Sequence, residues 1–525
     1  MHNPEMQHPV MYTIPSTSPL HEFPPSKEGQ QNEPTEEDLA AAKEENVTIR
    51  EDDDNSTIQE KSTDVGFLML FISCVVIWLS LGVYCIYHGD LSRLKLKPTN
   101  QQNGFTFLAC LFAALFSRLL LVLCCRFAKW VIWFVFVVVL AIISLFTAYM
   151  WIRYGDGGSF GSEEKKSRLV FAIIPTVLSF FFALRIFSMR KKIRLAVRLF
   201  KEASKAVQSM SLLLAQSFVT SVMLGIVICL FILFMYWIES SGIPQIKKNG
   251  NVEYQKNEIM KAASVCNFFV VWWIIQFIIC CQHMVIAKAT TIWYFSRDKT
   301  CIETESPIII GYVHTLRYHL GSVALGSLIL PPAQILRALY RAAKYVREGR
   351  ACRCLLTCFC GLDKIMQNLS CVTRKAYTEL AILGRGFITC GERSVQVSAK
   401  NAIKMSTINS VVDFVMNFCR FFVAVVAVLF GLQLKSLLRK IFSADDIALE
   451  MNFDQDFIFI PIISFVIAHA FMSAFEVIVE STFISFCENC ERYNGVKSVF
   501  MSEDMMVFAN EDTLQKLKAG GDTIP

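Results

Sequence analysis

The sequence is poor in charge and lacks the short motifs of several common enzyme classes. Charged residues make up only 18% of its 525 positions, whereas a typical soluble domain has about 25%. The net charge of +6 is small for this length and is spread over many loops, which argues against a nucleic-acid partner. The sequence holds no phosphate-binding P-loop, no HExxH zinc motif and no dinucleotide fingerprint. We therefore expect no catalytic residues, no cofactor, no metal site and no enzyme activity.

Long apolar blocks take up most of the chain, and 54% of the residues are hydrophobic. A helix of about 20 predominantly apolar residues spans a bilayer, because lipid offers no partner for free backbone groups. Nine blocks reach that length and a tenth is weaker. We therefore predict an all-α polytopic membrane protein with about ten transmembrane helices, one of them broken or re-entrant, within residues 65–485. The blocks lie at 65–87, 105–125, 130–152, 169–188, 211–238, 264–293, 318–340, 411–432 and 457–485, and the weaker one at 376–396.

The two ends of the chain differ from this apolar centre. Residues 1–64 are rich in Pro, Ser, Thr, Glu and Asp and contain few apolar residues, so we predict a disordered acidic tail. Residues 1–30 are polar and do not resemble a cleavable signal peptide. Residues 486–525 are predicted to form a cytosolic C-terminal segment. Two glycosylation sequons in the tail, at Asn46 and Asn55, matter only if the tail faces the lumen.

Basic residues predict how the spans are oriented. Segment 190–205 reads RKKIRLAVRLFKEASK and holds seven basic residues and one acid. Loops rich in Lys and Arg tend to stay in the cytosol, so we place this segment there. Alternation along the chain then puts the N-terminal tail in the cytosol as well. The loops at 88–104, 153–168 and 239–263 are expected on the opposite side of the membrane.

A second basic segment, at 341–375, conflicts with this alternation. If block 318–340 crosses the membrane once from the cytosol, the basic segment lies outside, against the rule for Lys and Arg. If the block dips in and returns as a re-entrant hairpin, the basic segment stays in the cytosol. Pro331 and Pro332 make a break possible, because a proline donates no backbone hydrogen bond and clashes with the preceding turn. The sequence is compatible with both courses.

The same basic segment carries two sets of candidate modification sites. Asn368 begins a sequon and would be glycosylated if it lies in the lumen. The stretch RACRCLLTCFC has four cysteines whose spacing fits no common zinc pattern. They are either palmitoylated at the membrane surface or free cytosolic thiols. The four are Cys352, Cys354, Cys358 and Cys360.

Block 318–340 is rich in small residues at its start. Ser322 and Gly326 stand four positions apart, a spacing that lets two helix backbones approach closely in lipid. Two interpretations remain open. The small residues serve plain helix packing, or they belong to a broken helix that lines a transport pathway.

Polar and ionisable residues recur at helical spacing in three of the predicted spans. Such residues are costly at membrane depth, so each stripe is expected to face protein or water rather than lipid. Three such stripes can line one aqueous or substrate cavity. As a structural alternative, Asp413 and Arg420 would pair with neighbouring helices and Glu480 would reach the membrane surface. The stripes are His469, Ser473, Glu476 and Glu480; Asn409, Asp413, Asn417 and Arg420; and Trp272, Gln276 and His283.

Several stretches in the second half of the chain resemble the choline transporter-like family. These are LRYHLGSVALGSLI near the start of block 318–340, ATTIWYFSRDK at 289–299, AYTELAILGRGF at 376–387 followed by SAKNA at 398–402, and FMSAFEVIVESTFISFCENCERYNG at 471–495. The matches are collinear and together cover roughly residues 264–505. The chain departs from the family pattern at three places: about eight extra residues near ITCGERSV, the pair Pro331-Pro332, and Glu476 in place of a small residue.

The resemblance implies transport of choline or a related amine such as ethanolamine, by alternating access, across the plasma membrane or an organelle membrane. A quaternary ammonium donates no hydrogen bond and is held by aromatic faces, with carboxylates nearby to balance its charge. The expected partners are a small organic cation and membrane lipids. The alternative is a non-transporting scaffold or lipid-regulatory membrane protein with the same fold. The candidate substrate-binding residues are Trp272, Gln276, Tyr318, Tyr377, Asp413, Glu476 and Glu480, and the candidate proton-coupling residues are His469, Glu476 and Glu480.

Overall fold

The computed structural model is almost entirely helical over the residues that it describes. These are residues 62–89, 100–155, 162–188, 190–210, 212–241, 243–246, 252–255, 258–296, 306–348, 372–400, 402–441 and 453–492. The helices are α2 (Val65–His88), α3 (Asn100–Arg126), α4 (Ala128–Gly155), α5 (Ser162–Ser188), α6 (Arg190–Ser209), α7 (Leu212–Ser240), α8 (Glu258–Phe295), α9 (Pro307–His314), α10 (Leu320–Glu348), α12 (Ala376–Leu383), α13 (Phe387–Lys400), α14 (Ala402–Ile441) and α15 (Phe453–Arg492). A π-helical turn, η3 (Thr315–His319), joins α9 to α10. The strands β1 (Ile243–Ile246) and β2 (Val252–Gln255) pair antiparallel as a hairpin.

Eight helical stretches of the described chain are long and apolar enough to cross a membrane, which confirms an all-α polytopic membrane protein. A further apolar stretch, Leu169–Leu184 in α5, is shorter. Large apolar side chains are exposed on the outer helices, for example Leu145 on α4 and Phe180 on α5, as a lipid-facing surface requires. The eight stretches are Val65–His88, Leu108–Arg126, Ala128–Gly155, Ala215–Ser240, Glu258–Phe295, Pro307–Tyr340, Ile408–Leu434 and Ile460–Glu491.

The weak tenth block, 376–396, is not one spanning helix. It forms the eight-residue α12 and the fourteen-residue α13, and Gly384 ends α12 with a left-handed φ of 66°. Residues 376–382 are all buried inside the bundle, so their apolar character serves packing against protein. The apolar composition of this block indicates burial, but the block is buried in protein and does not span lipid as one helix. The two cases cannot be told apart from composition, because burial in protein and burial in lipid select the same residue types.

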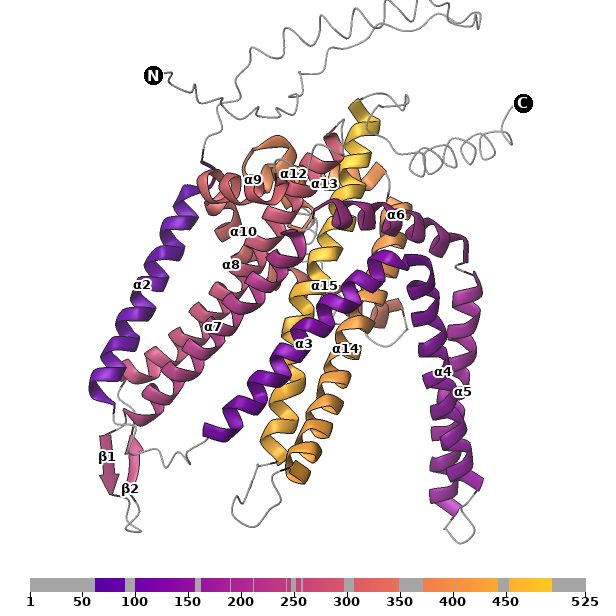
Figure 1. The fold of residues 1–525 in the computed structure, drawn as a ribbon, viewed down its shortest axis with the longest axis horizontal. Helices are drawn as coiled ribbons and strands as arrows, with labels where there is room; N and C mark the ends of the chain where they lie inside the picture. The colour runs from indigo at the N-terminus through magenta and orange to yellow at the C-terminus, as the bar shows by residue number, and fades with distance from the viewer. Residues whose placement is uncertain are drawn as a thin grey trace, which may run out of the picture.

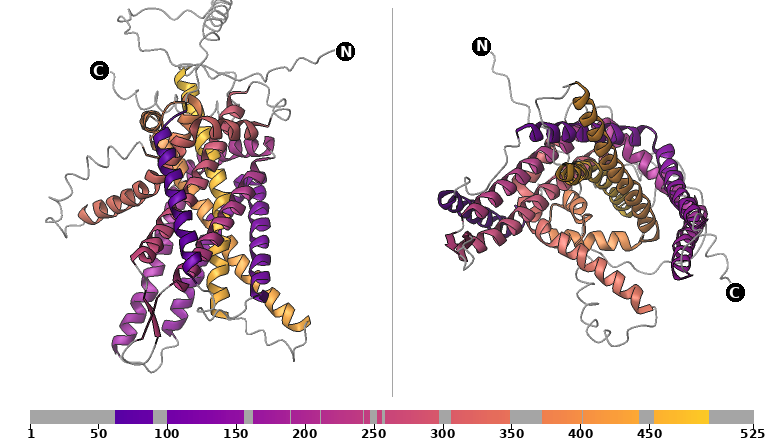
Figure 2. Two further views of the ribbon diagram at one scale, coloured as in Figure 1. Left: turned by 90° about the vertical axis from the view of Figure 1, so that its left-hand side faces the viewer. Right: turned by 90° about the horizontal axis from the view of Figure 1, so that it is seen from below.

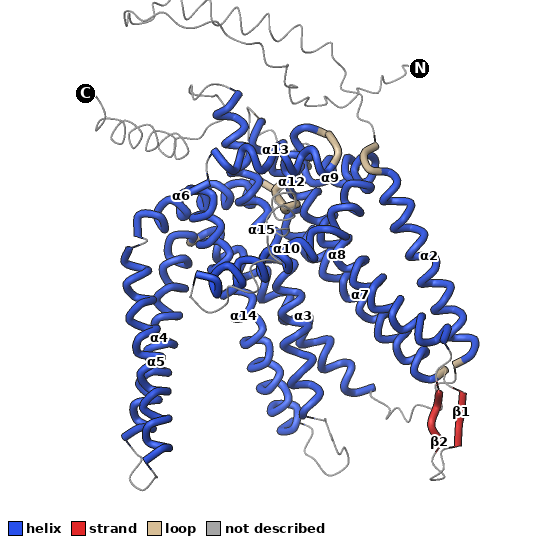
Figure 3. The backbone as a smooth tube through the Cα atoms, turned by 180° about the vertical axis from the view of Figure 1, so that it is seen from behind, coloured by secondary structure: helices blue, strands red, loops and turns tan. Residues whose placement is uncertain are grey.

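The bundle has two distinct ends (Figure 1). One end holds helix α6, the C-terminal end of α15 and the short helices α9, α12 and α13, and α2 also begins there. The β1–β2 hairpin and the adjoining ends of α4 and α5 lie at the other, as the view from behind also shows (Figure 3). This grouping agrees with the alternation expected from the basic segment 190–205. The assignment of that end to the cytosol stays a prediction.

The basic segment forms the amphipathic helix α6, which lies across the end of the bundle (Figure 1). Ile193, Ala196, Leu199 and Phe200 are fully or almost fully buried on one face of this helix. The ring of Phe200 packs against Phe475 of α15, with the ring centroids 4.5 Å apart. Apolar residues spaced three and four apart therefore dock α6 on the bundle, while charged residues such as Lys201 and Lys205 are exposed.

Block 318–340 follows an unusual course. By length and composition, Pro307–Tyr340 is sufficient to cross a membrane. However, α9 and the later helices α12 and α13 lie at the same end of the bundle (Figure 1), and the second half of α10 runs out sideways from it (Figure 2). Pro331 and Pro332 lie inside α10, ahead of this outward part. Helix α10 nevertheless runs without interruption from Leu320 to Glu348. The choice between a single crossing and a re-entrant hairpin therefore stays a prediction.

Candidate functional site

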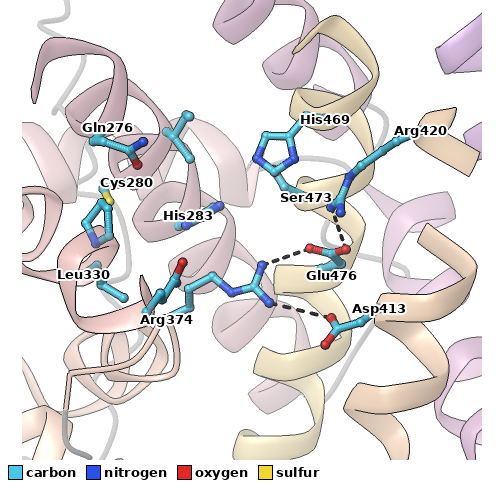
Figure 4. Close-up of a pocket in the computed structure, with 13 residues that line it drawn as sticks. Gln276, Cys280, His283, Leu330, Arg374, Asp413, Arg420, His469, Ser473 and Glu476 are labelled. Carbon is cyan, nitrogen blue, oxygen red and sulfur yellow. Dashed lines mark hydrogen bonds and ion pairs between the residues drawn. The ribbon is translucent and has the colours of Figure 1, made fainter. Parts of the chain in front are cut away.

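A cavity of about 450 Å³ lies between α8, α10, α14, α15 and the turn that precedes α12 (Figure 4). Its volume falls within the range of about 300–1,000 Å³ that is usual for small-molecule sites. Residues from every one of the three predicted stripes line it. The lining residues are Gln276, Ile279, Cys280, His283, Leu330, Pro331, Gln334, Arg374, Asp413, Arg420, His469, Ser473 and Glu476.

Helix α8 contributes a polar face through Gln276, Cys280 and His283, which are spaced four and three residues apart and so share one side of the helix. The His283 side chain is 5% exposed, and neither ring nitrogen has a hydrogen-bond partner among the described residues. A buried polar ring normally has a partner, so His283 is available to a bound water or ligand in the cavity.

Helix α15 contributes His469, Ser473 and Glu476, again at spacings of four and three. Glu476 is buried, and both of its carboxylate oxygens are bonded to arginines. Arg374 Nη1 donates to Oε2 at 2.9 Å, and Arg420 Nη2 donates to Oε1 at 2.6 Å. Arg420 also donates through Nη1 to Asn417 Oδ1 at 2.6 Å. The structural alternative foreseen for Arg420, an ion pair with a neighbouring helix, is therefore present.

Arg374 is the centre of the cluster. Besides Glu476, its guanidinium contacts Glu480, with Nη2 3.1 Å from Oε1, and Asp413, with Nη2 4.0 Å from Oδ1. Three carboxylates thus face two guanidiniums. The Lys375 ammonium also lies within electrostatic range of Glu480 and Asp413, so three basic side chains surround the three carboxylates. Glu480 pairs with Arg374 and its side chain is 11% exposed, so it does not extend away from the bundle as a surface residue would.

The aromatic candidates lie outside this cavity. Tyr318 is part of the η3 turn, and the Arg317 guanidinium carbon lies 5.4 Å from the centroid of its ring. Tyr377 is fully buried, 5.2 Å from the Phe387 ring between centroids, and Trp272 is half-buried next to Phe269. Among the described residues that line the cavity, none is a Phe, Tyr or Trp.

The predicted site is therefore assembled in part. One cavity is lined by four of the predicted residues, Gln276, Asp413, His469 and Glu476. Glu480 is not among the lining residues but forms an ion pair with Arg374, which is one of them. Sequence reasoning named Arg374 only as part of a basic segment and did not name Cys280 or Gln334 as site residues. One signal in the sequence pointed to Arg374. Several carboxylates at membrane depth require a nearby cation. The basic segment 341–375 could supply it, because it ends directly before the stretch 376–387 that resembles the transporter family.

The small residues of α10 have individual packing roles. A side chain at Gly321 would meet the carbonyl oxygens of Thr63 and Asp64, and one at Gly326 would meet the Tyr377 hydroxyl. Ser327 Oγ accepts a hydrogen bond from Trp273 Nε1 at 3.0 Å. The packing interpretation thus holds for the first half of α10. The pathway interpretation has support only further along, where Leu330 and Pro331 line the cavity.

Several candidate sites lie outside the described residues. These are the sequons at Asn46, Asn55 and Asn368, and the cysteines Cys352, Cys354, Cys358 and Cys360. Their predicted modification stays a prediction.

Comparison with known proteins adds independent findings. A family model described as plasma-membrane choline transporter matches residues 173–491. Choline transporter-like protein 1 of Torpedo marmorata is 26% identical over 467 residues, which cover 83% of this chain and 69% of that protein. Choline transporter-like protein 3 of Homo sapiens is 27% identical over 398 residues, covering 71% and 58%. Choline transporter-like protein 2 of Dictyostelium discoideum is 26% identical over 419 residues, covering 73% and 63%. The chain thus spans 58 to 69% of the length of these relatives.

Proposed function

Because the chain belongs to the family of plasma-membrane choline transporters, we propose that it carries choline or a related small amine, such as ethanolamine, across the plasma membrane. The family is one of transporters rather than enzymes, and the protein is a multi-pass membrane protein. The substrate and the particular membrane are part of the proposal, because the names of the relatives describe those proteins and not this chain.

The observation that carries the proposal is the convergence of Asp413, Glu476 and Glu480 at one cavity between membrane helices. Carboxylates at this depth are costly unless they are paired or used. Carboxylates gathered in this way require positive charge nearby, which a substrate cation can supply in exchange for one of the basic side chains around them. A small organic cation meets that requirement, even where its charged nitrogen is quaternary and carries no hydrogen-bond donor.

Alternating access is the transport mechanism that we propose. The cavity lies between α14 and α15 on one side and α8 and α10 on the other, so relative motion of these two pairs would open it to one side of the membrane at a time. Pro331 and Pro332 inside α10 give this helix a place to bend. Aromatic residues outside the present lining, Trp272 among them, would have to approach the cavity to hold a quaternary ammonium.

Proton coupling is the finer part of the proposal. His469 lies two turns before Glu476 on the same face of α15, and both line the cavity. Glu480 follows one turn later and shares Arg374 with Glu476. A proton taken up by one of these groups would offset the departure of the organic cation, so the net charge of the cluster would stay constant through the cycle.

The second candidate function is a non-transporting scaffold or lipid-regulatory protein. One observation favours it: Glu476 is bonded to two arginines, and no Phe, Tyr or Trp is present among the described lining residues. A permanently paired carboxylate in a cavity without these side chains would hold helices together and bind no choline.

Uptake of labelled choline into liposomes that contain the purified protein separates the two candidates. We expect saturable uptake that falls at least tenfold in Glu476→Gln, whereas Glu392→Gln, at an exposed position of α13, leaves it unchanged. Absence of saturable flux for both choline and ethanolamine would reject transport. Flux that keeps the same pH dependence in Glu476→Gln and Glu480→Gln would reject proton coupling alone.

A further inference from the structure

We propose that Arg374 is a tethered competitor of the transported cation: its guanidinium occupies the carboxylate site and must leave before a substrate cation can bind there. The proposal rests on the proposed function, because it assigns the same cavity to an organic cation. It adds a residue that sets affinity and specificity.

The two arginines of the cavity differ in how they are held. Arg420 is part of helix α14, its side chain is 6% exposed, and it bonds to Asn417 on its own helix and to Glu476. Arg374 belongs to a turn outside the helices, and its side chain is 23% exposed. Arg420 therefore acts as a fixed ion pair between α14 and α15, whereas Arg374 can withdraw by side-chain rotation.

Arg374 takes the position that an organic cation would need. Its guanidinium contacts Glu476, Glu480 and Asp413, which are the three carboxylates of the cluster. No second cation can approach the same oxygens without repulsion at contact distance. Since Asp413 is only 4.0 Å from Nη2 and its side chain is half exposed, it is the carboxylate most open to an arriving cation.

The turn that carries Arg374 is linked to α10. Arg337 Nη2 donates a hydrogen bond to the Val372 carbonyl oxygen at 2.7 Å, and Arg337 Nε donates to the Ala333 carbonyl oxygen. Ala333 directly follows Pro331 and Pro332. Bending of α10 at the prolines would therefore move the turn, so loading of the site and opening of the cavity would be coupled.

The first test removes the competitor. Arg374→Gln should lower the choline concentration needed for half-maximal uptake at least tenfold, and Arg374→Lys should retain the affinity of the unmodified protein. The control is Arg194→Gln, which removes an exposed arginine of α6 and should change neither value. A weaker choline affinity in Arg374→Gln than in the unmodified protein would overturn the proposal.

The second test includes a measurement that requires no choline transport, the melting temperature. In Arg374→Ala, methylguanidinium at millimolar concentration should refill the site, raise the melting temperature saturably and inhibit uptake competitively, while the unmodified protein shows neither effect. Equal responses of both proteins would overturn the proposal. If methylguanidinium stabilises Arg374→Ala but no choline uptake is found, the proposed substrate fails while a cation site filled by Arg374 is supported.

The third test uses the unmodified protein and so does not depend on folding of a variant. Phenylglyoxal modifies exposed arginines, and mass spectrometry locates the product. Saturating choline should speed modification of Arg374 and leave the buried Arg420 unchanged. Slower or unchanged modification of Arg374 in saturating choline would contradict its displacement.

Discussion

Arg420 Nη2 lies 2.6 Å from Glu476 Oε1 and joins α14 to α15 inside the bundle. Both side chains are at most 6% exposed. Glu476 is the carboxylate that compensates the charge of Arg420, whereas Glu476 is also bonded to Arg374. A buried ion pair of this kind adds little stability over an apolar pair, but its disruption leaves a buried charge without compensation.

The first prediction concerns this ion pair. Arg420→Gln should destabilise the protein by about 3–5 kcal/mol, because it leaves Glu476 with Arg374 as its only charged partner. Glu476→Gln should cost a similar amount. In the double variant the loss should be smaller than the sum of the two, since no unpaired charge remains between these positions. Thermal unfolding of the purified protein in detergent measures all three, and additive losses would contradict an interaction between the two residues.

The second prediction concerns the contact between the start of α2 and α10. Thr63 N donates to the Tyr318 carbonyl oxygen at 3.0 Å, and the Asp64 carboxylate accepts hydrogen bonds from Ser322 Oγ and from Phe387 N, at 2.5 and 3.0 Å. A methyl group at Gly321 would push these residues apart. Gly321→Ala should therefore destabilise the protein by about 1–3 kcal/mol.

Gly66→Ala is the matched control for Gly321→Ala. Gly66 lies in α2 next to the same contact, and no atom lies within 4 Å of a side chain built there. Replacement of a helical glycine by alanine at an open position should stabilise by about 0.5–1 kcal/mol. In a thermal unfolding assay, the melting temperature should therefore fall in Gly321→Ala and rise in Gly66→Ala. A lower melting temperature in both variants would show that the lack of space around Gly321 does not cause the loss of stability.

The third prediction compares two cations of α13 that bind acids of α15. Arg393 donates to Glu488 and Glu491, both at 2.8 Å, and these carboxylates raise the pKa of the guanidinium. Lys400 pairs with Glu491 at 3.0 Å, but its side chain is 63% exposed. Arg393→Gln should cost about 3 kcal/mol because Glu488 is buried, whereas Lys400→Gln should cost less than about 1 kcal/mol.

Salt provides the check on that comparison. Addition of salt screens exposed pairs far more than buried ones, so the effect of Lys400→Gln should vanish at about 1 M salt while that of Arg393→Gln persists. Equal salt sensitivity of the two variants would contradict the assignment of Glu488 to the protein interior.

The fourth prediction concerns Cys390 on α13. Its thiol is fully buried, and burial raises its pKa to about 12. The thiolate is the reactive form, so at pH 8 almost none is present in the folded protein. N-ethylmaleimide should leave Cys390 unlabelled in the native protein and label it after unfolding in detergent, as peptide mass spectrometry would show. Rapid labelling in the native state would mean that α13 detaches from the bundle.

Sequence periodicity predicted which residues share a face of one helix. The spacing of His469, Ser473 and Glu476 indicated a common face of α15, and the structure places all three at one cavity. The same argument grouped Gln276 with His283 on α8. Periodicity succeeded because the helical repeat is a local property of the chain, independent of what the helix packs against.

Helical periodicity could not predict which other part of the chain each polar helix face contacts. Arg374 and Glu476 are 102 residues apart in the chain, and no local pattern relates them. The aromatic candidates failed to reach the cavity for a similar reason. Tyr377 is fully buried against Gly326 and Phe387, although its residue type suits a cation site equally well.

The sequence by itself determined that this chain is a helical membrane protein, because a block of apolar residues long enough to span lipid leaves no other way to satisfy its backbone. It also indicated which polar residues share one face of a helix. Only the tertiary structure decided that 376–396 folds as two short buried helices, that α10 turns aside, and that Arg374 meets the three carboxylates. These features depend on which surfaces pack together, and packing is set by contacts between residues far apart in the chain.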